Sequence, residues 1–376
     1  MELTAPRSDL GAAPHGGAQP AAARTDIKGL LPDELREFIA RLGKERYRAS
    51  QLLRWVHGRG VHDFDEMTDL TKTFREELRR IARVEHLGEI ARIRSADGET
   101  TRLVFRLADG LRIETVAMQD DDRRTVCVSS QAGCALQCDF CATGQLGLGR
   151  NLTAGELVDQ VIQAAKLFPG HERPATNVVF MGMGEPLQNY DAVVRAVCLL
   201  SLEMGLAISA AHVTVSTAGL VPMIHRLAAD LPRVGLAISL NATTDEVRTR
   251  LMPINRRYPL AELMAAAAAT AKASGRRWVT FEYALIDGVN DSDEDARRLV
   301  RMTSSFPCKI NLIPFNPVPD RSYRRPPVER IERFAAILAD RRRTVTVRWS
   351  KGDDITAACG QLQALAAAEP SVGPAM

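Results

Sequence analysis

Aromatic side chains are scarce in this chain, and features typical of several protein classes are missing. Phe, Trp and Tyr together make up 5% of the 376 residues. This scarcity argues against a protein that binds RNA mainly by stacking bases on exposed rings. No apolar run approaches the roughly 18 residues that a membrane-spanning helix needs. The N-terminus has no basic segment followed by an apolar stretch, so we expect no signal peptide.

A strong charge of one sign is also missing, since the net charge is +3 and the pI is near 8.5. This balance permits a polyanionic partner without requiring one. With 45% hydrophobic and 25% charged residues, the chain can build one large core with smaller appendages.

Cysteine is present in an odd number, seven, and four of the seven lie within residues 127–141. This distribution excludes the even, spaced framework of a secreted disulfide protein. We therefore expect a cytoplasmic protein without a membrane anchor.

Three of these cysteines form the run Cys134-x3-Cys138-x2-Cys141. The spacing offers three thiolates in one short loop, which suits a [4Fe–4S] cluster with one iron left open for another ligand. The alternative is a zinc loop, but zinc sites usually have a second Cys or His pair, and the sequence has none at a suitable spacing.

Hydrophobic periodicity divides the chain into five predicted segments. Residues 1–28 are rich in Ala, Gly and Pro and are predicted to be a disordered leader. The other segments are a helical module (29–86), a β-meander (87–120), an α/β core (121–349) and a tail (350–376). The tail is predicted to be helical over 353–368.

Within the core, short apolar runs alternate with amphipathic helical patterns. Six β-α repeats predict a parallel sheet that is closed or partly closed. One helix, over 153–167, begins with a capping box formed by Thr153 and Glu156. The predicted strands are Thr125–Ser129, Asn177–Met181, Val213–Ser216, Val234–Leu240, Trp278–Leu285 and Ile310–Phe315, followed by a further strand at Thr344–Trp349.

Small polar residues follow several of these strands. Gly182-Met-Gly184-Glu185-Pro comes directly after one strand, and glycines at a strand end expose backbone groups to a ligand. Because parallel strands end at the same edge, Ser216, Ser239, Asn241 and Asn316 could contact one shared ligand. Ser and Asn are also ordinary turn residues, which is the alternative for each of them.

Four cysteines lie outside the loop. Cys198 and Cys308 are interpreted as buried small hydrophobic residues. Cys127 precedes Cys134 by seven residues, and Cys359 lies in the tail between small and polar neighbours. A cysteine in such a segment is suited to being delivered to a site.

The three-cysteine loop resembles the signature of radical S-adenosylmethionine (SAM) enzymes, and the GEP element resembles the one that contacts SAM in that superfamily. The resemblance implies a six-unit partial barrel, a [4Fe–4S] cluster held by Cys134, Cys138 and Cys141, and SAM bound at its open iron. It further implies SAM contacts at Gly184, Glu185, Ser216, Ser239, Leu240, Asn241 and Asn316.

A longer resemblance covers residues 29–368 and points to one group within that superfamily, the RlmN/Cfr family of RNA adenine methyltransferases. It rests on Phe64-Asp-Glu-Met-Thr-Asp-Leu, Thr125-Val-Cys-Val-Ser-Ser-Gln-Ala-Gly-Cys, Arg150-Asn-Leu, Gly182-Met-Gly-Glu-Pro-Leu, Pro314-Phe-Asn-Pro and Gly352-Asp-Asp-Ile-Thr-Ala-Ala-Cys-Gly-Gln-Leu.

The family resemblance implies methylation of adenosine C2 in 23S rRNA and in tRNA, at the adenosine 3′ of the anticodon. One SAM would methylate Cys359, and a second would supply the radical that activates the S-methyl group for covalent addition to C2. Cys127 would then release the product by forming a disulfide with Cys359, which must be reduced before the next turnover. Glu114 would accept the C2 proton; alternatively, it is a strand carboxylate paired with Arg102 or Arg106.

The implied partners are 23S rRNA, tRNA and an electron donor of the flavodoxin or ferredoxin type, with the protein acting as a monomer. The helical module and the meander would grip the RNA fold, and basic pairs near the motif loops would contact phosphates. Two alternatives remain open: methylation at adenine C8, as in Cfr, and a non-catalytic metal-containing module that binds RNA. The basic pairs are Arg123-Arg124, Arg256-Arg257 and Arg324-Arg325, and a further basic run is Arg341-Arg342-Arg343.

Overall fold

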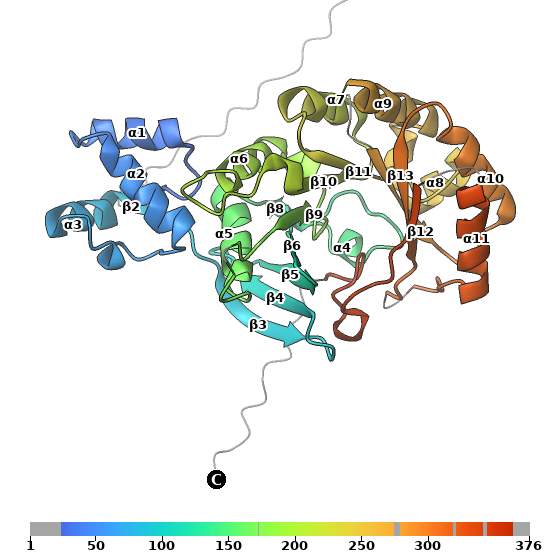
Figure 1. Ribbon diagram of the computed structural model, residues 1–376, viewed down its shortest axis with the longest axis horizontal. Coiled ribbons are helices and arrows are strands. Elements are labelled where there is room, and N and C mark those ends of the chain that lie inside the picture. Colours follow the sequence, from blue (N-terminus) through green and yellow to red (C-terminus); the bar gives the residue numbers. More distant parts are fainter. Residues whose placement is uncertain (1–23, 172, 274–278, 319–320, 341–343, 364–376) are drawn as a thin grey trace, which may run out of the picture.

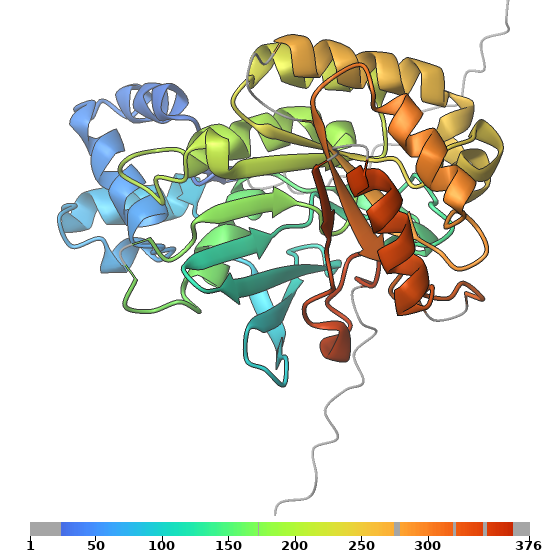
Figure 2. The same ribbon diagram turned by 45° about the vertical axis from the view of Figure 1, so that its right-hand side comes forward.

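A ten-stranded sheet organises the molecule, wrapped by helices on its outer side (Figures 1 and 2). The computed structural model describes residues 24–171, 173–273, 279–318, 321–340 and 344–363. The strand order is β14-β13-β12-β11-β10-β9-β6-β5-β4-β3. The sheet has two ends, β14 and β3, so the barrel is partial.

Six neighbouring strands of this sheet run parallel and are the six that the sequence predicts. β14 (Thr344–Val347) adds a seventh parallel strand beside β13. The six are β6 (Arg123–Cys127), β9 (Asn177–Phe180), β10 (Val213–Thr217), β11 (Gly235–Ser239), β12 (Val279–Leu285) and β13 (Cys308–Pro314). The prediction of a radical SAM-type partial (β/α)6 barrel is therefore confirmed.

Helices connect successive parallel strands and bury apolar faces against the sheet. Thr153 and Glu156 cap α5 reciprocally, as the sequence predicts. These helices are α5 (Ala154–Ala165), α6 (Tyr190–Leu200), α7 (Val221–Asp230), α8 (Asp245–Leu251), α9 (Leu260–Ala273), α10 (Asp293–Met302) and α11 (Val328–Asp340). Short 3-10 turns lie at 64–66, 186–189, 210–212 and 253–256. Within the described residues, no helix is long and apolar enough to cross a membrane.

The predicted meander is confirmed as β3 (Gly88–Arg94), β4 (Thr100–Arg106) and β5 (Arg112–Asp120), all antiparallel. It is not a separate sheet. β5 pairs with β6 from Val116 opposite Cys127 to Asp120 opposite Arg123, so the meander extends the barrel sheet. This continuity places β5 beside the first barrel strand.

The N-terminal module has its own hydrophobic cluster, which extends from Ile27 to Val84. Its elements are β1 (Thr25–Asp26), α1 (Pro32–Arg41), α2 (Tyr47–Leu53), a π-helical turn (Arg54–Gly58), α3 (Lys72–Ile81) and β2 (Ala82–Arg83). The predicted leader of residues 1–28 is wrong for its last five residues. β1 pairs with β2, and Ile27 and Lys28 are buried because they join the module core. Residues 1–23 lie outside the described residues.

A buried ion pair joins this module to the barrel. The ammonium group of Lys28 donates to the Asp159 carboxylate on α5, and both side chains are 1% exposed. The other oxygen of Asp159 accepts from the backbone N–H of Leu87 at 2.8 Å. Burial raises the pKa of Asp159, but His86 and Lys28 together hold it below its ordinary value.

The predicted tail helix over 353–368 is wrong for residues 353–363, the part that the structure describes. The structure has a single 3-10 turn, Asp353–Ile355, and no helix from 356 to 363, while 364–376 lie outside the described residues. Gly352 and Thr356 flank the turn with φ of +71° and +51°. These left-handed conformations interrupt a helix on both sides of the turn.

Candidate active site

The cysteine loop lies between two paired strands and the end of the barrel. β7 (Gln131–Gly133) and β8 (Leu148–Asn151) form a small antiparallel sheet around it, and α4 (Ala142–Gln145) follows Cys141. The backbone N–H of Cys134 donates to Gly147 at 2.8 Å, and that of Asp139 donates to Leu251 at 2.9 Å. These bonds fix the loop at the carboxyl ends of the parallel strands.

Two neighbouring cavities occupy the inner side of the sheet. The upper cavity lies at the carboxyl ends of the strands and is lined by all three loop cysteines, Gly184, Glu185, Ser216, Ser239, Asn241, Asn316 and others. The lower cavity lies toward the strand starts and is lined by Cys127, Lys309, Asn311, Thr346, Arg348, Trp349 and others. Ligands of parallel α/β sheets usually bind at carboxyl strand ends, which is where the upper cavity lies.

The three loop cysteines suit a cluster better than a single ion. They line one cavity, yet within the described residues no three Cys, His, Asp or Glu side chains converge closely enough for one metal ion. A cluster spreads its irons apart, so its thiolates need not converge on one point. Three thiols lining one cavity are a donor set that fits a [4Fe–4S] cluster with one open iron.

Burial sets the charge state of these thiols. It raises the pKa of Cys134 to about 11 and raises the pKa values of Cys138 and Cys141 as well. Each of Cys134 and Cys141 raises the pKa of Cys138 further. The loop therefore requires bound cations to stabilise three thiolates side by side.

The GEP element is fixed in place at the end of β9. Gly184 has φ of +96°, and a Cβ there would lie 2.5 Å from the Cβ of Gln131, so only glycine fits. The Glu185 carboxylate accepts from the backbone N–H groups of Ala218 at 2.8 Å and Leu187 at 3.0 Å. Burial raises the pKa of Glu185 to about 7, while both N–H groups act in the opposite direction.

Most of the other predicted SAM contacts line the same cavity, with one exception. Leu240 does not line the cavity, because its side chain is fully buried in the main core. Its backbone N–H donates to the carbonyl of Glu282 and so continues the pairing of β11. Asn241 lines the cavity with φ of +58° and accepts from the N–H of Ala284 at 2.8 Å. Leu240 could therefore contribute backbone groups only.

Asn316 connects the upper cavity to the tail. Its amide nitrogen donates to the carbonyl of Cys359 at 3.1 Å, and its oxygen accepts from Ser350 at 2.6 Å. The tail is also held by Arg325, which donates to Asp353 at 2.9 Å. The backbone N–H of Ala142, next to the cluster loop, donates to the carbonyl of Gly360 at 2.8 Å. These bonds bring the tail cysteine beside the cluster loop.

Cys359 lies where the two cavities meet. Five residues line both cavities: Met181, Glu282, Ile313, Cys359 and Leu362. Although Cys359 lies deep in the molecule, its surface is accessible because it faces this internal space. The sequence motif places it in a tail, and the structure brings this tail to the centre of the barrel.

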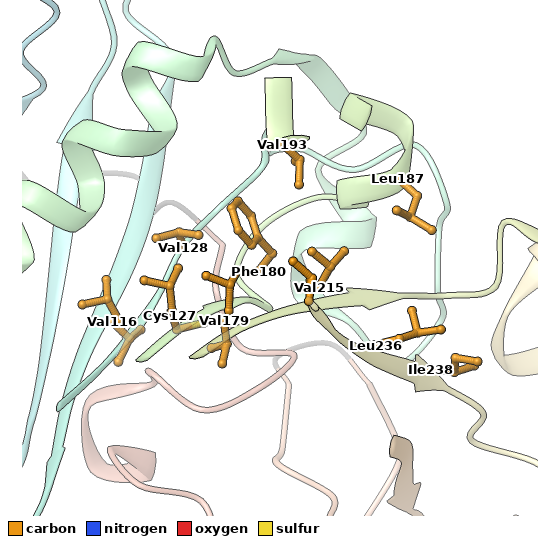
Figure 3. Close-up of a cluster of buried hydrophobic side chains, with 14 of the residues drawn as sticks. Val116, Cys127, Val128, Val179, Phe180, Leu187, Val193, Val215, Leu236 and Ile238 are labelled. Carbon is orange, nitrogen blue, oxygen red and sulfur yellow. The ribbon is translucent and has the colours of Figure 1, made fainter. Parts of the chain in front are cut away.

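Cys127 lines the lower cavity from β6. It lies opposite Val116 of β5 and Val179 of β9, and Figure 3 shows it among these buried side chains. Burial raises the pKa of Cys127 to about 11 and that of Cys359 to about 12. The positive charge of Arg348 acts in the opposite direction on both thiols.

Glu114 is fully buried on β5, and an oxygen of its carboxylate lies 3.8 Å from the guanidinium of Arg102. It lines neither of the two cavities, although its neighbour on the same face of the strand, Val116, lines the lower one. The same guanidinium donates to the tail carbonyl of Thr356 at 3.3 Å. Arg102 therefore links Glu114 to the segment that carries Cys359.

Comparisons with known proteins agree with this geometry. The chain is 50% identical over 347 residues to the dual-specificity RNA methyltransferase RlmN of Geobacter sulfurreducens, covering 92% of this chain and 94% of the relative. It is 51% identical to the protein of the same name from Syntrophotalea carbinolica, covering 90% of each chain. The chain belongs to the RlmN family.

Two family models and a solved structure support this assignment. The ribosomal RNA large subunit methyltransferase N-terminal domain matches residues 25–84, and the radical SAM superfamily matches residues 128–300. A crystal structure of a radical SAM methyltransferase from Sphaerobacter thermophilus superimposes with a TM-score of 0.88 at 50% identity, covering 91% of this chain and all of that one. As a radical SAM methyltransferase, the protein uses a [4Fe–4S] cluster and SAM.

Sequence reasoning missed Arg248, which this RlmN-family chain buries completely on α8. Its guanidinium donates to the carbonyls of Ala218 at 2.7 Å and Leu240 at 3.1 Å, and to the side chain of Asn255 at 2.9 Å. It thereby ties together the ends of β10 and β11, where the upper cavity begins. In the sequence it resembles any charged residue on a helix, so no pattern identified it.

The basic pairs divide into exposed and structural members. Arg123 is exposed and lines the lower cavity, whereas Arg124 is buried and donates to the carbonyl of Arg173 at 3.1 Å. Arg324 is exposed, whereas Arg325 holds the tail. Arg256 and Arg257 are both exposed, and Arg341-Arg342-Arg343 lies outside the described residues.

The two remaining cysteines differ from each other. Cys308 is buried, as predicted. Cys198 is exposed on α6, because its position falls on the solvent side of that helix, so its predicted burial is wrong.

Proposed function

We propose that this protein methylates C2 of adenosine in 23S rRNA, and C2 of the tRNA adenosine 3′ of the anticodon, through a methylated Cys359. The observation that carries the proposal is the position of Cys359 at the junction of the two cavities. From there, one thiol can face a methyl donor on one side and a nucleobase on the other. Membership of the RlmN family favours C2 over the C8 chemistry of Cfr.

Cys134, Cys138 and Cys141 would hold the cluster and leave one iron for the SAM amino and carboxylate groups. When bound, cluster and SAM together supply a methyl group and a radical that abstracts hydrogen. Glu185 and Gly184 would orient the amino end of SAM, and Asn241 and Asn316 would contact the rest of it. Two SAM molecules would be used in each turnover.

Cys359 would carry the methyl group as a thioether, because adenine C2 is electron-poor and cannot attack SAM directly. After the activated methylene forms a bond to C2, Cys127 attacks the sulfur of Cys359. Before this attack, the adduct would give up one electron to the oxidised cluster and the C2 proton to Glu114. The disulfide then forms as the carbon–sulfur bond breaks, the released carbon takes up a proton to become the methyl group, and methyladenosine leaves. Cys127 lines the lower cavity, into which the base would extend.

Glu114 would accept the proton lost from C2. In this structure Glu114 is fully buried beside Arg102, so its carboxylate is not exposed to either cavity. Arg102 also donates a hydrogen bond to the tail carbonyl of Thr356. Movement of the tail would therefore shift Arg102 and expose the Glu114 carboxylate to the base.

The N-terminal module and the exposed basic residues near the lower cavity would hold the RNA, with Arg123 contributing to phosphate binding. We further propose a cytoplasmic monomer that receives electrons from a flavodoxin or ferredoxin type donor. A reducing compartment keeps the free thiols and the cluster functional.

The decisive experiment is nucleoside mass spectrometry of RNA treated with the reduced, cluster-loaded enzyme and SAM. The proposal expects 2-methyladenosine in both 23S rRNA and tRNA; 8-methyladenosine would instead establish the Cfr-type activity. A preparation that generates no 5′-deoxyadenosine with SAM and RNA would leave a non-catalytic RNA-binding module as the interpretation.

A further inference from the structure

Glu282 is a buried carboxylate at the centre of the barrel for which the proposed function above has no role. It lies on β12 and is 6% exposed. Of the five residues that line both cavities, only Glu282 and Cys359 carry groups that exchange protons. The other three, Met181, Ile313 and Leu362, are apolar.

A hydrogen bond fixes the Glu282 carboxylate, and several charged groups share its two cavities. The amide of Asn311, opposite it on β13, donates to the carboxylate at 3.0 Å. Charged and titratable groups share both cavities with Glu282. Those of the lower cavity are Asp120, Arg123, Cys127, Lys309, Arg348, Lys351 and Cys359, and those that line only the upper cavity are Glu185 and the three loop cysteines. Burial raises the pKa of Glu282, while Arg348 and Asn311 act in the opposite direction and favour the carboxylate.

Methylation of Cys359 requires a proton acceptor, and none of the residues given a role above supplies one for this step. Cys359 must lose its thiol proton to attack a methyl group, and the nearby cluster cysteines cannot take that proton when they bind iron. Glu282 and Cys359 line the same two cavities. Burial raises the pKa of the Cys359 thiol, and the negative charge of Glu282 raises it further. A buried carboxylate in this position is suited to accept a proton from it.

We propose that Glu282 is the proton acceptor that activates Cys359 for its methylation by SAM, an inference that rests on the proposed carrier role of Cys359. The Cys359 sulfur forms a bond to the SAM methyl carbon as the methyl–sulfonium bond breaks. The thiol proton passes to the Glu282 carboxylate, and S-adenosylhomocysteine leaves. Atoms and charge balance without a reductant.

The test isolates this step by omitting the reductant, so that no radical chemistry follows. Cluster-loaded enzyme is first demethylated at Cys359 by one turnover, and its Cys127–Cys359 disulfide is then reduced with a thiol reagent that is removed. This enzyme is mixed with deuteromethyl-SAM. The tail peptide is then analysed by mass spectrometry over time. Because a positioned base contributes about 10²–10⁴-fold to a proton transfer, E282Q should methylate Cys359 at least about 100-fold more slowly than the wild type.

Companion measurements separate proton transfer from a structural role. E282D, which keeps a carboxylate, should recover part of the rate, and E246Q on the exposed side of α8 should match the wild type. The wild-type rate should fall with decreasing pH as Glu282 takes up a proton, and E282Q should lack this dependence. Iron content and melting temperature report whether the variants fold.

E282Q that labels Cys359 at the wild-type rate would overturn this inference and leave the carrier role of Cys359 intact. A wild-type enzyme that never labels Cys359 would overturn the carrier role itself, and Glu282 with it.

Discussion

The two cavities of the barrel differ in how their functional groups are assembled. The upper cavity takes three of its four thiols from eight consecutive residues, Cys134–Cys141, held by backbone bonds. The lower cavity takes Cys127 from β6 and Arg348 from the chain beyond β14, and it shares Cys359 with the upper cavity. A cofactor site can thus be built by one loop, whereas the covalent chemistry depends on distant segments meeting.

Replacing one loop cysteine or the tail cysteine should distinguish the cofactor site from the site of covalent chemistry with the largest effects. Cys359→Ala should abolish RNA methylation while iron content stays at the wild-type level, because Cys359 is not a predicted cluster ligand. Cys138→Ala should abolish methylation and also lose the iron. Iron analysis beside nucleoside mass spectrometry checks both variants. A fully active Cys359→Ala enzyme would show that the carrier role is wrong.

Cys127→Ala should leave methyl transfer to the base possible but block release. Enzyme should then accumulate covalently on RNA and appear as a slowly migrating band on a denaturing gel. Free methylated RNA formed at the normal rate would contradict the resolving role of Cys127.

Loosening the tail should have a smaller effect, because it displaces Cys359 without removing it. Arg325→Gln loses a charged hydrogen bond to Asp353. A charged bond contributes on the order of 2 kcal/mol, which corresponds to about 30-fold in rate, so we expect RNA methylation to slow by up to about 30-fold. Arg301→Gln is the control, since that side chain lies on α10, is 62% exposed and belongs to none of the basic pairs, so its loss should have little effect. Equal rates in both variants would argue against anchoring by Arg325.

Breaking the ion pair between the N-terminal module and the barrel should lower the free energy of unfolding more than a substitution in either cavity does. Asp159→Asn leaves Lys28 buried without its counter-ion, at a cost of about 3–5 kcal/mol. The pKa of Asp159 is lower in the folded protein than its unfolded value of about 3.9. The ion pair therefore stabilises the fold above that value, and its contribution is lost as pH falls through the lower folded-state pKa. Thermal melts across pH 2–7 for both proteins measure this difference.

The predictions that succeeded rest on patterns confined to short stretches. The strands, the capping box of Thr153 and the glycine turn before Glu185 were all identifiable because strand and helix periodicities depend on neighbouring residues. The cysteine spacing likewise indicated a cluster rather than a zinc ion. The parallel direction of the six strands was also predicted correctly, because a helix that follows each strand returns the chain to the same end of the sheet.

The predictions that failed concern residues whose environment is decided by distant chain segments. The last five residues of the predicted leader are ordered by distant partners: β1 pairs with β2, and Lys28 binds Asp159, 131 positions away. The described part of the tail is not an α-helix, and three of its carbonyls, those of Cys359, Gly360 and Thr356, accept bonds from Asn316, Ala142 and Arg102.

The amino-acid sequence by itself determined the cysteine loop, the six βα repeats and the family, because each depends on local spacing or on motifs kept in order along the chain. Only the tertiary structure decided that Cys359 lies between two cavities, that Glu282 lines both cavities with it, and that Glu114 is buried beside Arg102. These positions depend on how a non-helical tail packs across the sheet. That packing depends on hydrogen bonds between residues far apart in the chain, which no local pattern encodes.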